Sequence, residues 1–521
     1  RQVHDFLGCP TRCSRGRDSE SEIMIKLSGP LTSKIDRGSE LYQKLSAANS
    51  RLSKKDSTLW GPKAQAEAAV RLNWVDLPES SRDLLPALDA LAAKFKGRDL
   101  ILCGMGGSSL APEVIAGTYK KRAFIFDLTD PNYAAHALKR DLSNSVVVVS
   151  SKSGSTIETA SQRAAMESAL TSQGLDPKSH LIFVTDPGSP LDQEVRAGGY
   201  TVINADPNVG GRFSALSAFG LVPAALLDVD PSILLDSASA QKAELQKDEN
   251  VAIDLAYLMF SNSEQFVAFT DSPEIPGLSD WIEQLIAEST GKDQKGRVPV
   301  VIASPNEAIG SAQMRITFNS GGDLVVSGDL GEHFITWEWA TALLGFALEI
   351  DPFNQPNVTE AKNATSELLT EWSNKLPAPS ELPATHTPEQ ALNELISNCE
   401  GYIAILAYLD RKEDVELVEL RRVLAEKSGK PVTFGWGPRF QHSTGQFHKA
   451  GQPNGSFLII TGDVKEDFAI AGKEFTFQTL VMAQALGEFR ALGARKYPVV
   501  RIHLTDRASG ISEILNAAKK L

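Results

Sequence analysis

The sequence predicts an α/β protein built on doubly wound parallel sheets. From about residue 66 onward, short apolar runs of strand length alternate with longer segments of helical periodicity. Some of these runs, such as the four valines at 146–149, are apolar at every position, which suits strands covered by helices on both faces. Two of the runs end in turns rich in glycine or serine, at the kind of junction where open α/β sheets bind ligands.

Strand candidates fall into three groups along the chain. They are residues 100–103, 123–126, 146–149, 181–184 and 202–203, then 266–269, 298–302 and 324–326, and finally 402–406, 432–434, 457–460 and 499–502. A stretch rich in proline, serine and threonine at 376–388 has the composition of a linker. We therefore expect four parts: a partly disordered lead-in at 1–65, a first domain at 66–240, a second at 241–375, and a C-terminal α/β unit at 389–521.

Bulk properties exclude several classes of function. The 521 residues suffice for two to four domains, each with its own core. With 52 basic against 65 acidic residues, the formal charge of -13 argues against nucleic acid or an anionic membrane as a partner. No run is long enough to span a membrane, and the four cysteines lack the spacing of a metal site, so we expect a cytoplasmic protein. From the sequence we expect either that Met24 is the true start or that the chain is the downstream part of a longer polypeptide.

A serine-rich loop follows the valine run. Because the segment after it has helical spacing, the loop is expected at a helix N-terminus, where free N–H groups and the helix dipole favour an anion. The alternative is an ordinary strand-to-helix turn with a capping hydroxyl. The residues of this predicted anion loop are Ser151, Lys152, Ser153, Gly154, Ser155 and Thr156.

A glycine turn, Gly106-Gly107-Ser108, follows the strand candidate at 100–103. Such turns occur in dinucleotide sites as well as in sugar-phosphate sites. A dinucleotide site usually has an acidic residue after the next strand, and Asp127 or Asp130 would serve. The second phosphate-like loop a few dozen residues later argues against that alternative, since a dinucleotide fold does not need it.

Two further segments present a single charged residue at a helix end. Arg212 follows a glycine pair, and a guanidinium that keeps its proton can stabilise a developing oxyanion, although an arginine on the surface of the helix is an equally good interpretation. Glu288 stands near a helix C-terminus, where the dipole opposes a carboxylate and favours its role as a proton acceptor.

Histidines and one lysine complete the candidates. His442 and His448 lie in a glycine-rich aromatic loop at 434–449, and histidine suits proton transfer near neutral pH. His333, before an aromatic helix, is a weaker competitor. Lys362 taken alone is interpreted as a solvated lysine on a helix.

Taken together, these motifs resemble the phosphoglucose isomerase family over about residues 66–505. The motifs that carry the resemblance are the glycine turn, the serine-rich loop, Gly-Gly-Arg-Phe-Ser at 210–214, Glu-Ser-Thr-Gly-Lys at 288–292, and Phe-Asn-Gln-Pro-Asn-Val at 353–358 followed by Lys362. The sequence style is most similar to the isomerase part of bifunctional transaldolase/phosphoglucose isomerase proteins. The resemblance implies two doubly wound domains of the sugar-isomerase (SIS) type plus a C-terminal α/β extension.

The resemblance also implies roles for individual residues in converting glucose 6-phosphate to fructose 6-phosphate. Glu288 would be the base, and Arg212 would stabilise a cis-enediol intermediate. His442 and Lys362 would open the sugar ring. The expected substrate-binding residues are Ser108, Ser151, Lys152, Ser153, Ser155, Thr156, Gly211, Gln284 and Gln355. We expect neither a metal nor an organic cofactor, since this chemistry needs a base and oxyanion donors.

One departure from the family order concerns the histidine loop, which here follows Lys362 by about eighty residues instead of preceding it. The C-terminal unit must therefore fold back over the site. The choice of His442 over His448 depends on the Ser-Thr-Gly-Gln that follows His442. A regulator that binds a sugar phosphate without turning it over, an isomerase for another phosphosugar such as mannose 6-phosphate, and the isomerase part of a longer fusion remain alternatives. The family is commonly dimeric, which leaves a homodimer open.

Overall fold

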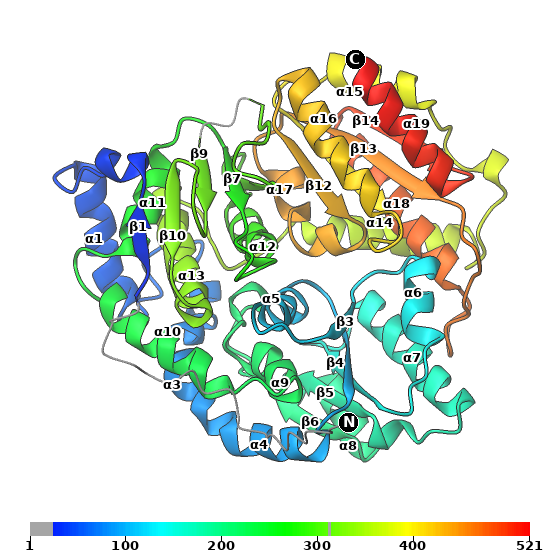
Figure 1. The fold of residues 1–521 in the computed structure, drawn as a ribbon, viewed down its shortest axis with the longest axis horizontal. Helices are drawn as coiled ribbons and strands as arrows, with labels where there is room; N and C mark the ends of the chain where they lie inside the picture. The colour runs from blue at the N-terminus through cyan, green and yellow to red at the C-terminus, as the bar shows by residue number, and fades with distance from the viewer. Residues whose placement is uncertain (1–23, 311–313) are drawn as a thin grey trace, which may run out of the picture.

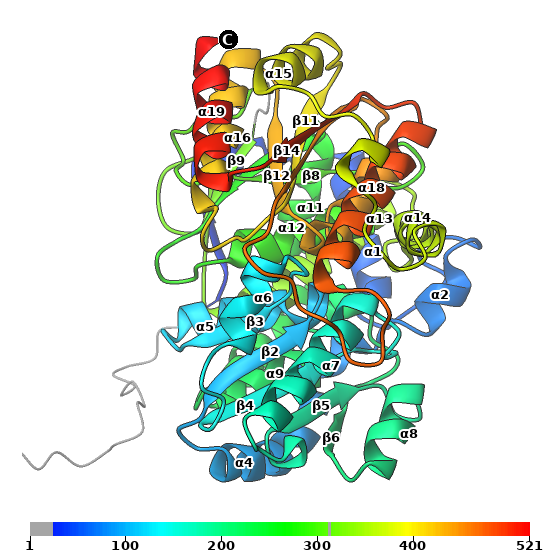
Figure 2. The same ribbon diagram turned by 90° about the vertical axis from the view of Figure 1, so that its right-hand side faces the viewer.

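The computed structural model describes residues 24–310 and 314–521. Three sheets, each made mostly of parallel strands, form three parts of the molecule (Figures 1 and 2). The α/β class is confirmed, and each predicted strand group lies in one sheet. The disorder predicted for the lead-in concerns residues outside the described ranges. Within the described residues, no helix is both long and apolar enough to cross a membrane.

The first sheet contains five parallel strands in the order β3-β2-β4-β5-β6. All five were predicted. Their bounds are β2 (Asp99–Gly104), β3 (Ala123–Phe126), β4 (Ser145–Ser150), β5 (Leu181–Thr185) and β6 (Thr201–Asn204). The surrounding helices are α4 (Leu85–Lys94), α5 (Leu110–Thr118), α6 (Pro131–Leu138), α7 (Ile157–Ser172), α8 (Pro190–Ala197) and α9 (Ala218–Leu226).

Alternate residues of each central strand belong to different cores. Val146 and Val148 pack in the cluster that includes α4, α5 and α9, whereas Val147 and Val149 pack in the cluster that includes α6, α7 and α8. All four valines are at most 1% exposed. Burying a valine side chain contributes roughly 1.5–3 kcal/mol, which explains why this strand is apolar at every position.

The second sheet has the order β1-β10-β9-β7-β8, in which β1 is antiparallel to β10 and the other pairs are parallel. The strands β7, β8 and β10 were predicted, and β1 and β9 were not. Their bounds are β1 (Lys26–Ser28), β7 (Phe266–Thr270), β8 (Val298–Val301), β9 (Met314–Thr317) and β10 (Leu324–Ser327). The neighbouring helices are α1 (Glu40–Leu52), α2 (Gln65–Ala69), α3 (Leu77–Ser80), α10 (Pro231–Leu245), α11 (Val251–Ser261), α12 (Leu278–Thr290) and α13 (Leu330–Ala347).

The third sheet has four parallel strands in the order β12-β11-β13-β14. All four were predicted: β11 (Tyr402–Tyr408), β12 (Val432–Trp436), β13 (Gly455–Gly462) and β14 (Val499–Leu504). One face is covered by α15 (Pro388–Ser397), α16 (Glu419–Ser428) and α19 (Arg507–Lys520). The elements near the other face include α17 (Gly445–Ala450) and α18 (Phe477–Ala494), and α14 (Val358–Glu371) packs against α18.

The second and third sheets share one core. Phe266 and Ala268 of β7 lie in the same cluster as Ala404 and Leu406 of β11. Ala287 of α12 and Phe447 of α17 belong to this cluster as well. The C-terminal unit therefore packs directly on the helix that carries Glu288, as the departure in motif order required. The division at 66–240, 241–375 and 389–521 remains our proposed assignment of domains.

Candidate functional site

The glycine turn and the serine-rich loop leave the first sheet side by side. β2 pairs with β3 on one side and with β4 on the other, so the strand order reverses between β2 and β4. Gly104 ends β2, Ser150 ends β4, and the two are register partners. Ligands of open parallel sheets bind at the carboxyl ends of the strands at such a reversal. The two predicted phosphate-like turns therefore share this position.

In the serine-rich loop, hydroxyl groups stand at the N-terminus of α7. Thr156 is the N-cap residue of this helix. The Ser151 Oγ is buried and accepts a bond from the Gly154 N–H at 3.1 Å, which shapes the turn. Ser153 and Ser155 are exposed, and their Oγ atoms lie 2.7 Å apart. These hydroxyls, together with the amides of the first helical turn, form a cradle suited to an anion.

Lys152, from the same loop, points toward the neighbouring turn. Its Nζ lies 2.7 Å from Asp186 Oδ2 and donates to the Pro207 carbonyl at 2.9 Å. Burial of Asp186 raises the pKa of that carboxyl, against the opposing effect of the Lys152 charge. The ammonium therefore ties the loop to the segments after β5 and β6.

Two glycines let the loops of the site approach one another. Gly106 and Gly107 lie in the short 3-10 helix η4 (Gly106–Ser108). A Cβ on Gly107 would come within 1.9 Å of the Gly211 carbonyl oxygen, and one on Gly106 would come within 3.0 Å of the His442 carbonyl oxygen. Gly106 also has a φ of 54°, in the left-handed region that glycine adopts without strain. The glycine turn thus contacts the arginine segment and the histidine loop, and Ser108 at its end is partly exposed.

Arg212 is 4% exposed and lies at the centre of the site. Its Nε donates to Ser289 Oγ at 2.7 Å, and one Nη donates to Gln355 Oε1 at 2.9 Å. The other Nη donates to the carbonyls of Pro352 and Asn354 at 2.6 and 3.1 Å. The guanidinium is therefore held in one orientation by residues of two separate segments, and the interpretation of Arg212 as a surface residue is wrong.

Glu288 lies beside Arg212, near the C-terminus of α12. Its Oε1 is 3.5 Å from the Arg212 Nη1, and its Oε2 accepts a bond from Gln284 Nε2 at 3.1 Å. The same Gln284 Nε2 donates to the His442 carbonyl at 2.8 Å. Glu288 is 8% exposed. A carboxylate, a guanidinium and an amide therefore meet at a position with little solvent exposure. This grouping can move a proton and stabilise a negative charge.

His442, the first histidine of the histidine loop, lies on the side of the site that the serine-rich loop forms. His442 Nε2 lies 3.2 Å from Glu158 Oε1, and Glu158 belongs to the first turn of α7. Gln484 of α18 donates to the same oxygen at 2.8 Å. Burial alone raises the pKa of Glu158, but the charge of His442 and the hydrogen bonds to the carboxylate outweigh it and bring this pKa below its ordinary value. The sequence analysis did not predict Glu158 or Gln484.

The competing histidines lie elsewhere in the core. His448 is 3% exposed and its Nδ1 is 2.8 Å from the Tyr402 hydroxyl. His333 is fully buried in α13. Burial lowers the pKa of each to about 3, so both are neutral at physiological pH. Their burial favours His442, whose side chain is 13% exposed, as the histidine available to a ligand.

Gln446 joins three of the motifs. Its Nε2 donates to the Gly291 carbonyl at 3.1 Å and to Asn357 Oδ1 at 3.0 Å, and its Oε1 accepts from the Asn357 N–H at 2.9 Å.

Lys362 is exposed one turn into α14, and its charge also favours the ionised form of Glu158. Gln355 is exposed as well.

A partly buried charge cluster docks the histidine loop on the first sheet. Arg439, three residues before His442, lies 2.7 Å from Glu113 Oε2 and 2.8 Å from Asp127 Oδ2. Arg411 lies 2.8 Å from Glu113 and 3.5 Å from Asp127. We call Glu113, Asp127, Arg411 and Arg439 the docking cluster. It was not predicted from the sequence, because some of its members are more than 300 residues apart.

Asp127 and Asp130 were the two candidates to bind the ribose of a dinucleotide, and both are instead paired with arginines. Asp127 is fully buried in the docking cluster. Asp130 is 1% exposed and pairs with Arg507 at 2.6 Å. Neither carboxylate faces an open turn, which argues against the dinucleotide alternative.

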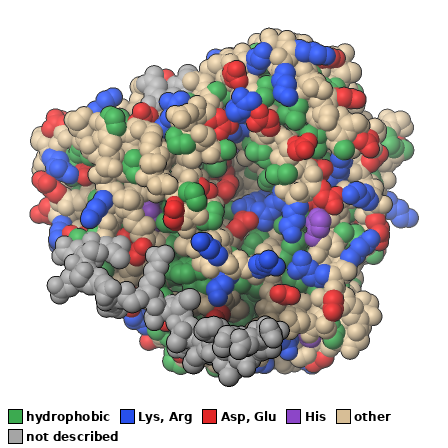
Figure 3. Space-filling model, viewed as in Figure 1, with side chains coloured by type: hydrophobic (Ala, Val, Ile, Leu, Met, Phe, Trp, Pro, Cys, Tyr) green, Lys and Arg blue, Asp and Glu red, His purple; other side chains and the backbone are tan. Residues whose placement is uncertain are grey.

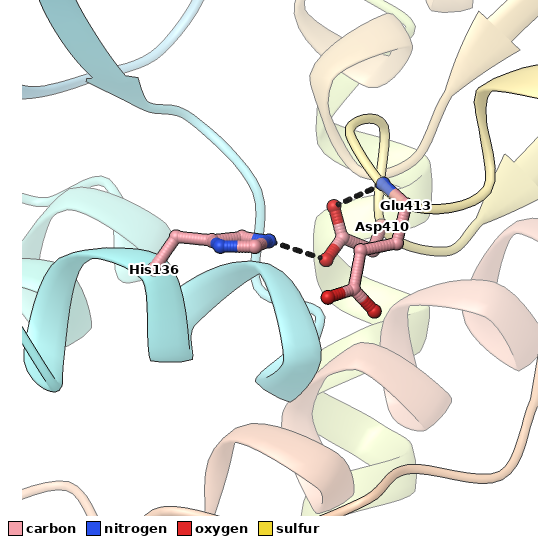
Figure 4. Close-up of side chains that lie close together, drawn as sticks. All are labelled: His136, Asp410 and Glu413. Carbon is pink, nitrogen blue, oxygen red and sulfur yellow. Dashed lines mark hydrogen bonds and ion pairs between the residues drawn. The ribbon is translucent and has the colours of Figure 1, made fainter.

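One group of side chains has the composition of a metal site. His136 of α6 points toward Asp410 and Glu413 of the C-terminal unit, as Figure 4 shows. Protein groups already partner each of them: His136 Nε2 is 2.8 Å from Asp410 Oδ2, and Glu413 Oε2 is 2.6 Å from Lys465 Nζ. The Asp410 Oδ1 accepts the Glu413 N–H at 3.3 Å. Because these three side chains already have protein partners, their arrangement does not require a bound cation.

The fold and this site together define an α/β protein with parallel-sheet domains and a candidate anion site at the carboxyl ends of the strands of the first sheet. A crystal structure of a glucose-6-phosphate isomerase from Chlamydia trachomatis D/UW-3/Cx superposes with a TM-score of 0.54 at 21% identity. The superposition covers 67% of this chain and 89% of that one, and it shows a shared fold.

Within that class, the resemblance to phosphoglucose isomerase is confirmed over residues 92–295, which match the family model of that name. The match includes the glycine turn, the serine-rich loop, Arg212, Gln284 and Glu288. It ends before Gln355, Lys362 and His442, whose roles remain predictions.

Curated relatives agree with the family match. The glucose-6-phosphate isomerase of Campylobacter jejuni subsp. jejuni serotype O:2 is 31% identical over 234 residues, which are 43% of this chain and 58% of the relative. That of Geobacter sulfurreducens is 33% identical over 214 residues, 38% of this chain and 40% of the relative. That of Thermus thermophilus is 31% identical, over 45% of this chain and 59% of the relative. The chain thus spans about half the length of the curated relatives it matches.

Proposed function

We propose that the protein interconverts glucose 6-phosphate and fructose 6-phosphate through a cis-enediol intermediate. The observation that carries the proposal is the convergence of Glu288 and Arg212, with Oε1 and Nη1 3.5 Å apart, beside the glycine turn that leaves the first sheet next to the serine-rich loop. A base, an oxyanion donor and an anion cradle are the three groups that this isomerisation needs.

The substrate is held by its phosphate end. Ser151, Ser153, Ser155 and Thr156 bind the phosphate with the first amides of α7, and Lys152 supports the loop through Asp186. Ser108, Gly211, Gln284 and Gln355 contact the sugar oxygens. The positive end of the helix dipole faces the phosphate, which favours the dianion by roughly 0.3–1 kcal/mol or more at a partly buried position.

Glu288 then transfers a proton between two carbons. Its carboxylate takes the proton from the second carbon of the open aldose, and electron density moves onto the carbonyl oxygen of the first carbon. Arg212 stabilises that oxygen as its negative charge develops. The proton returns to the first carbon while the hydroxyl proton of the second carbon passes to the oxygen of the first carbon, which gives the neutral ketose.

Ring opening precedes this step and is assigned to His442 and Lys362. The histidine moves a proton between the ring oxygen and the first hydroxyl. Glu158 acts through His442 as a positioning residue, since its Oε1 faces the His442 Nε2 at 3.2 Å. The low exposure of His448 and His333 supports the choice of His442.

The remaining assignments are part of the same proposal. No metal or organic cofactor enters the reaction. We propose a cytoplasmic location from the low cysteine content, and a homodimer remains a prediction from the family resemblance. Activity on a second phosphosugar and fusion to a transaldolase remain open alternatives.

A comparison of the wild type with Glu288→Gln tests the proposal. Purified protein is incubated with glucose 6-phosphate, and fructose 6-phosphate is measured in a coupled assay. We expect the variant to lose about 10²–10⁴-fold in kcat, the usual contribution of a general base. Glu274→Gln, an exposed carboxylate on the loop before α12, is the matched control and should keep full activity.

Two results would overturn the proposal. Wild-type turnover by Glu288→Gln would reject the mechanism. Saturable binding of fructose 6-phosphate by a wild type without turnover would favour the regulator.

A further inference from the structure

A cavity lies beside the proposed active site, and its lining contains none of the predicted site residues. It has a volume of about 310 Å³ and lies where α5, α12 and β12 come together. Figure 3 shows the face of the molecule hollowed near its centre, with acidic, basic and apolar side chains around the hollow. The residues that decide its chemistry are Asp280 and Glu283 of α12, together with Phe434, Trp436 and Phe440.

Two carboxylates that line this cavity, those of Asp280 and Glu283, have no cationic side chain as a partner within the described residues. Arg411 and Arg439 both line it, but each is paired with Glu113 and Asp127 in the docking cluster, whose formal charges sum to zero. Asp280 and Glu283 form no hydrogen bond or ion pair with any residue in the described parts of the chain. Glu283 as a residue is only 8% exposed, and it lines the cavity.

A buried carboxylate without a partner is costly, and a cation of matching shape would remove that cost. Three aromatic side chains form the apolar part of the wall, and aromatic faces attract organic cations. A metal ion would gain little from those rings and prefers several oxygen ligands. The combination of two acids and three rings is therefore better suited to an ammonium group on an apolar stem.

We propose that this cavity binds a small organic cation with a primary ammonium group, which Asp280 and Glu283 hold and Phe434, Trp436 and Phe440 enclose. The site lies outside the sugar-phosphate site and does not depend on the proposed isomerase activity. Phe440 and Ser443, which both line the cavity, stand on either side of the Gln441-His442 pair, so an occupant contacts the histidine loop.

Binding should be linked to proton release. Burial raises the pKa of Asp280 to about 6 and that of Glu283 well above its ordinary value. The neighbouring charges oppose one another: Asp271 and Glu113 raise the pKa of Asp280, whereas Arg439 and Arg411 lower it. A bound ammonium favours the ionised carboxylates, so affinity should increase as the pH rises through the range in which the two groups ionise, which begins near 6 for Asp280 and extends higher for Glu283.

The test is a ligand-observed NMR titration of the purified full chain with n-butylammonium chloride at constant ionic strength, without sugar phosphate. We expect one saturable site per chain and at least tenfold weaker binding by Glu283→Gln and by Asp280→Asn. Glu274→Gln removes the same charge from an exposed position outside the cavity lining and should bind as the wild type does. Both cavity variants remove a carboxyl group that lacks a partner, so they should keep the wild-type thermal unfolding midpoint or raise it.

Two further ligands test the class of the occupant. n-Butanol has the same stem without the charge and should bind at least tenfold more weakly, and MgCl₂ should not displace n-butylammonium. The proposal is overturned if the wild type shows no saturable binding, if Glu283→Gln and Asp280→Asn bind as tightly as the wild type, or if Mg²⁺ binds in preference to the amine. Since no activity is measured, such a failure would leave the isomerase proposal untouched.

Discussion

Single residues decide whether the loops of the site can meet, and Gly107 illustrates this most directly. Because its Cβ position lies 1.9 Å from the Gly211 carbonyl oxygen, any side chain there must push the glycine turn away from the Arg212 segment. Gly107→Ala should destabilise the fold by about 1–3 kcal/mol, as overpacking does, and should lower kcat for the isomerisation. Thermal unfolding and the coupled assay measure both effects.

Gly493 of α18 provides the control for this substitution. Nothing lies within 4 Å of its Cβ position, so Gly493→Ala should be neutral or stabilise the helix by up to about 1 kcal/mol. Equal activity and unfolding midpoints for Gly107→Ala and the wild type would contradict the close approach of the two loops.

Glu158 acts on the proposed reaction only through its partner, His442. It faces His442 Nε2, so Glu158→Gln keeps the shape but removes the negative charge beside the imidazole ring. We expect about 10–10²-fold slower turnover of the cyclic sugar with less effect on proton exchange in the open chain, the same pattern expected for His442→Ala. Equal losses in both assays would indicate a merely structural role.

Glu158 also shows where sequence reasoning ends. An acidic residue in the first turn of a helix already has an explanation, because it complements the helix dipole. Its partner, His442, is 284 residues away, and no local pattern connects the two. The anion loop, Arg212 and Glu288 were predictable because each stands at a strand or helix end with a marked composition.

At the scale of elements, the histidine loop keeps its place through the docking cluster. Arg439 contributes a charge that is paired with Glu113 and Asp127, and its side chain is 12% exposed. Arg439→Met leaves Asp127, which is fully buried, short of a countercharge, which should cost up to about 3–5 kcal/mol. The thermal unfolding midpoint should fall by several degrees, and KM and kcat should both worsen because His442 is three residues away.

Arg422 of α16 is the matched control. It pairs with Glu419 and Glu426 on the surface, where such pairs contribute about 0–1 kcal/mol. Arg422→Met should therefore leave the unfolding midpoint and the activity nearly unchanged. If the two arginine variants behaved alike, the docking cluster would not be what holds the loop.

Strands were predictable where they are apolar on both faces and missed where they are not. The sequence of β4 has valine at four consecutive positions, so its burial is visible in the sequence. By contrast, β9 contains an arginine, and β1 has three residues and pairs antiparallel at the sheet edge. Its pairing with β10 is a contact between segments about 300 residues apart, which local periodicity does not reveal.

At the scale of the whole molecule, three sheets of one chain contribute to one site. The first supplies the glycine turn and the serine-rich loop, the segment beside the second supplies Glu288, and the third supplies His442. Because every predicted catalytic residue comes from the same chain, specific activity should be constant over a hundredfold dilution. A loss of activity on dilution, matched by dissociation in sedimentation, would show that a second copy completes the site.

The central claim is that Glu288 moves a proton between two carbons of a hexose 6-phosphate, and proton NMR of glucose 6-phosphate incubated with the protein in D₂O tests it most directly. The account predicts that fructose 6-phosphate forms and that deuterium enters at the second carbon of the aldose, because a carboxylic acid that has taken a proton exchanges it with solvent. With Glu288→Gln, both signals should fall about 10²–10⁴-fold. Unchanged spectra with the wild-type protein, or deuterium incorporation by Glu288→Gln at the wild-type rate, would contradict it.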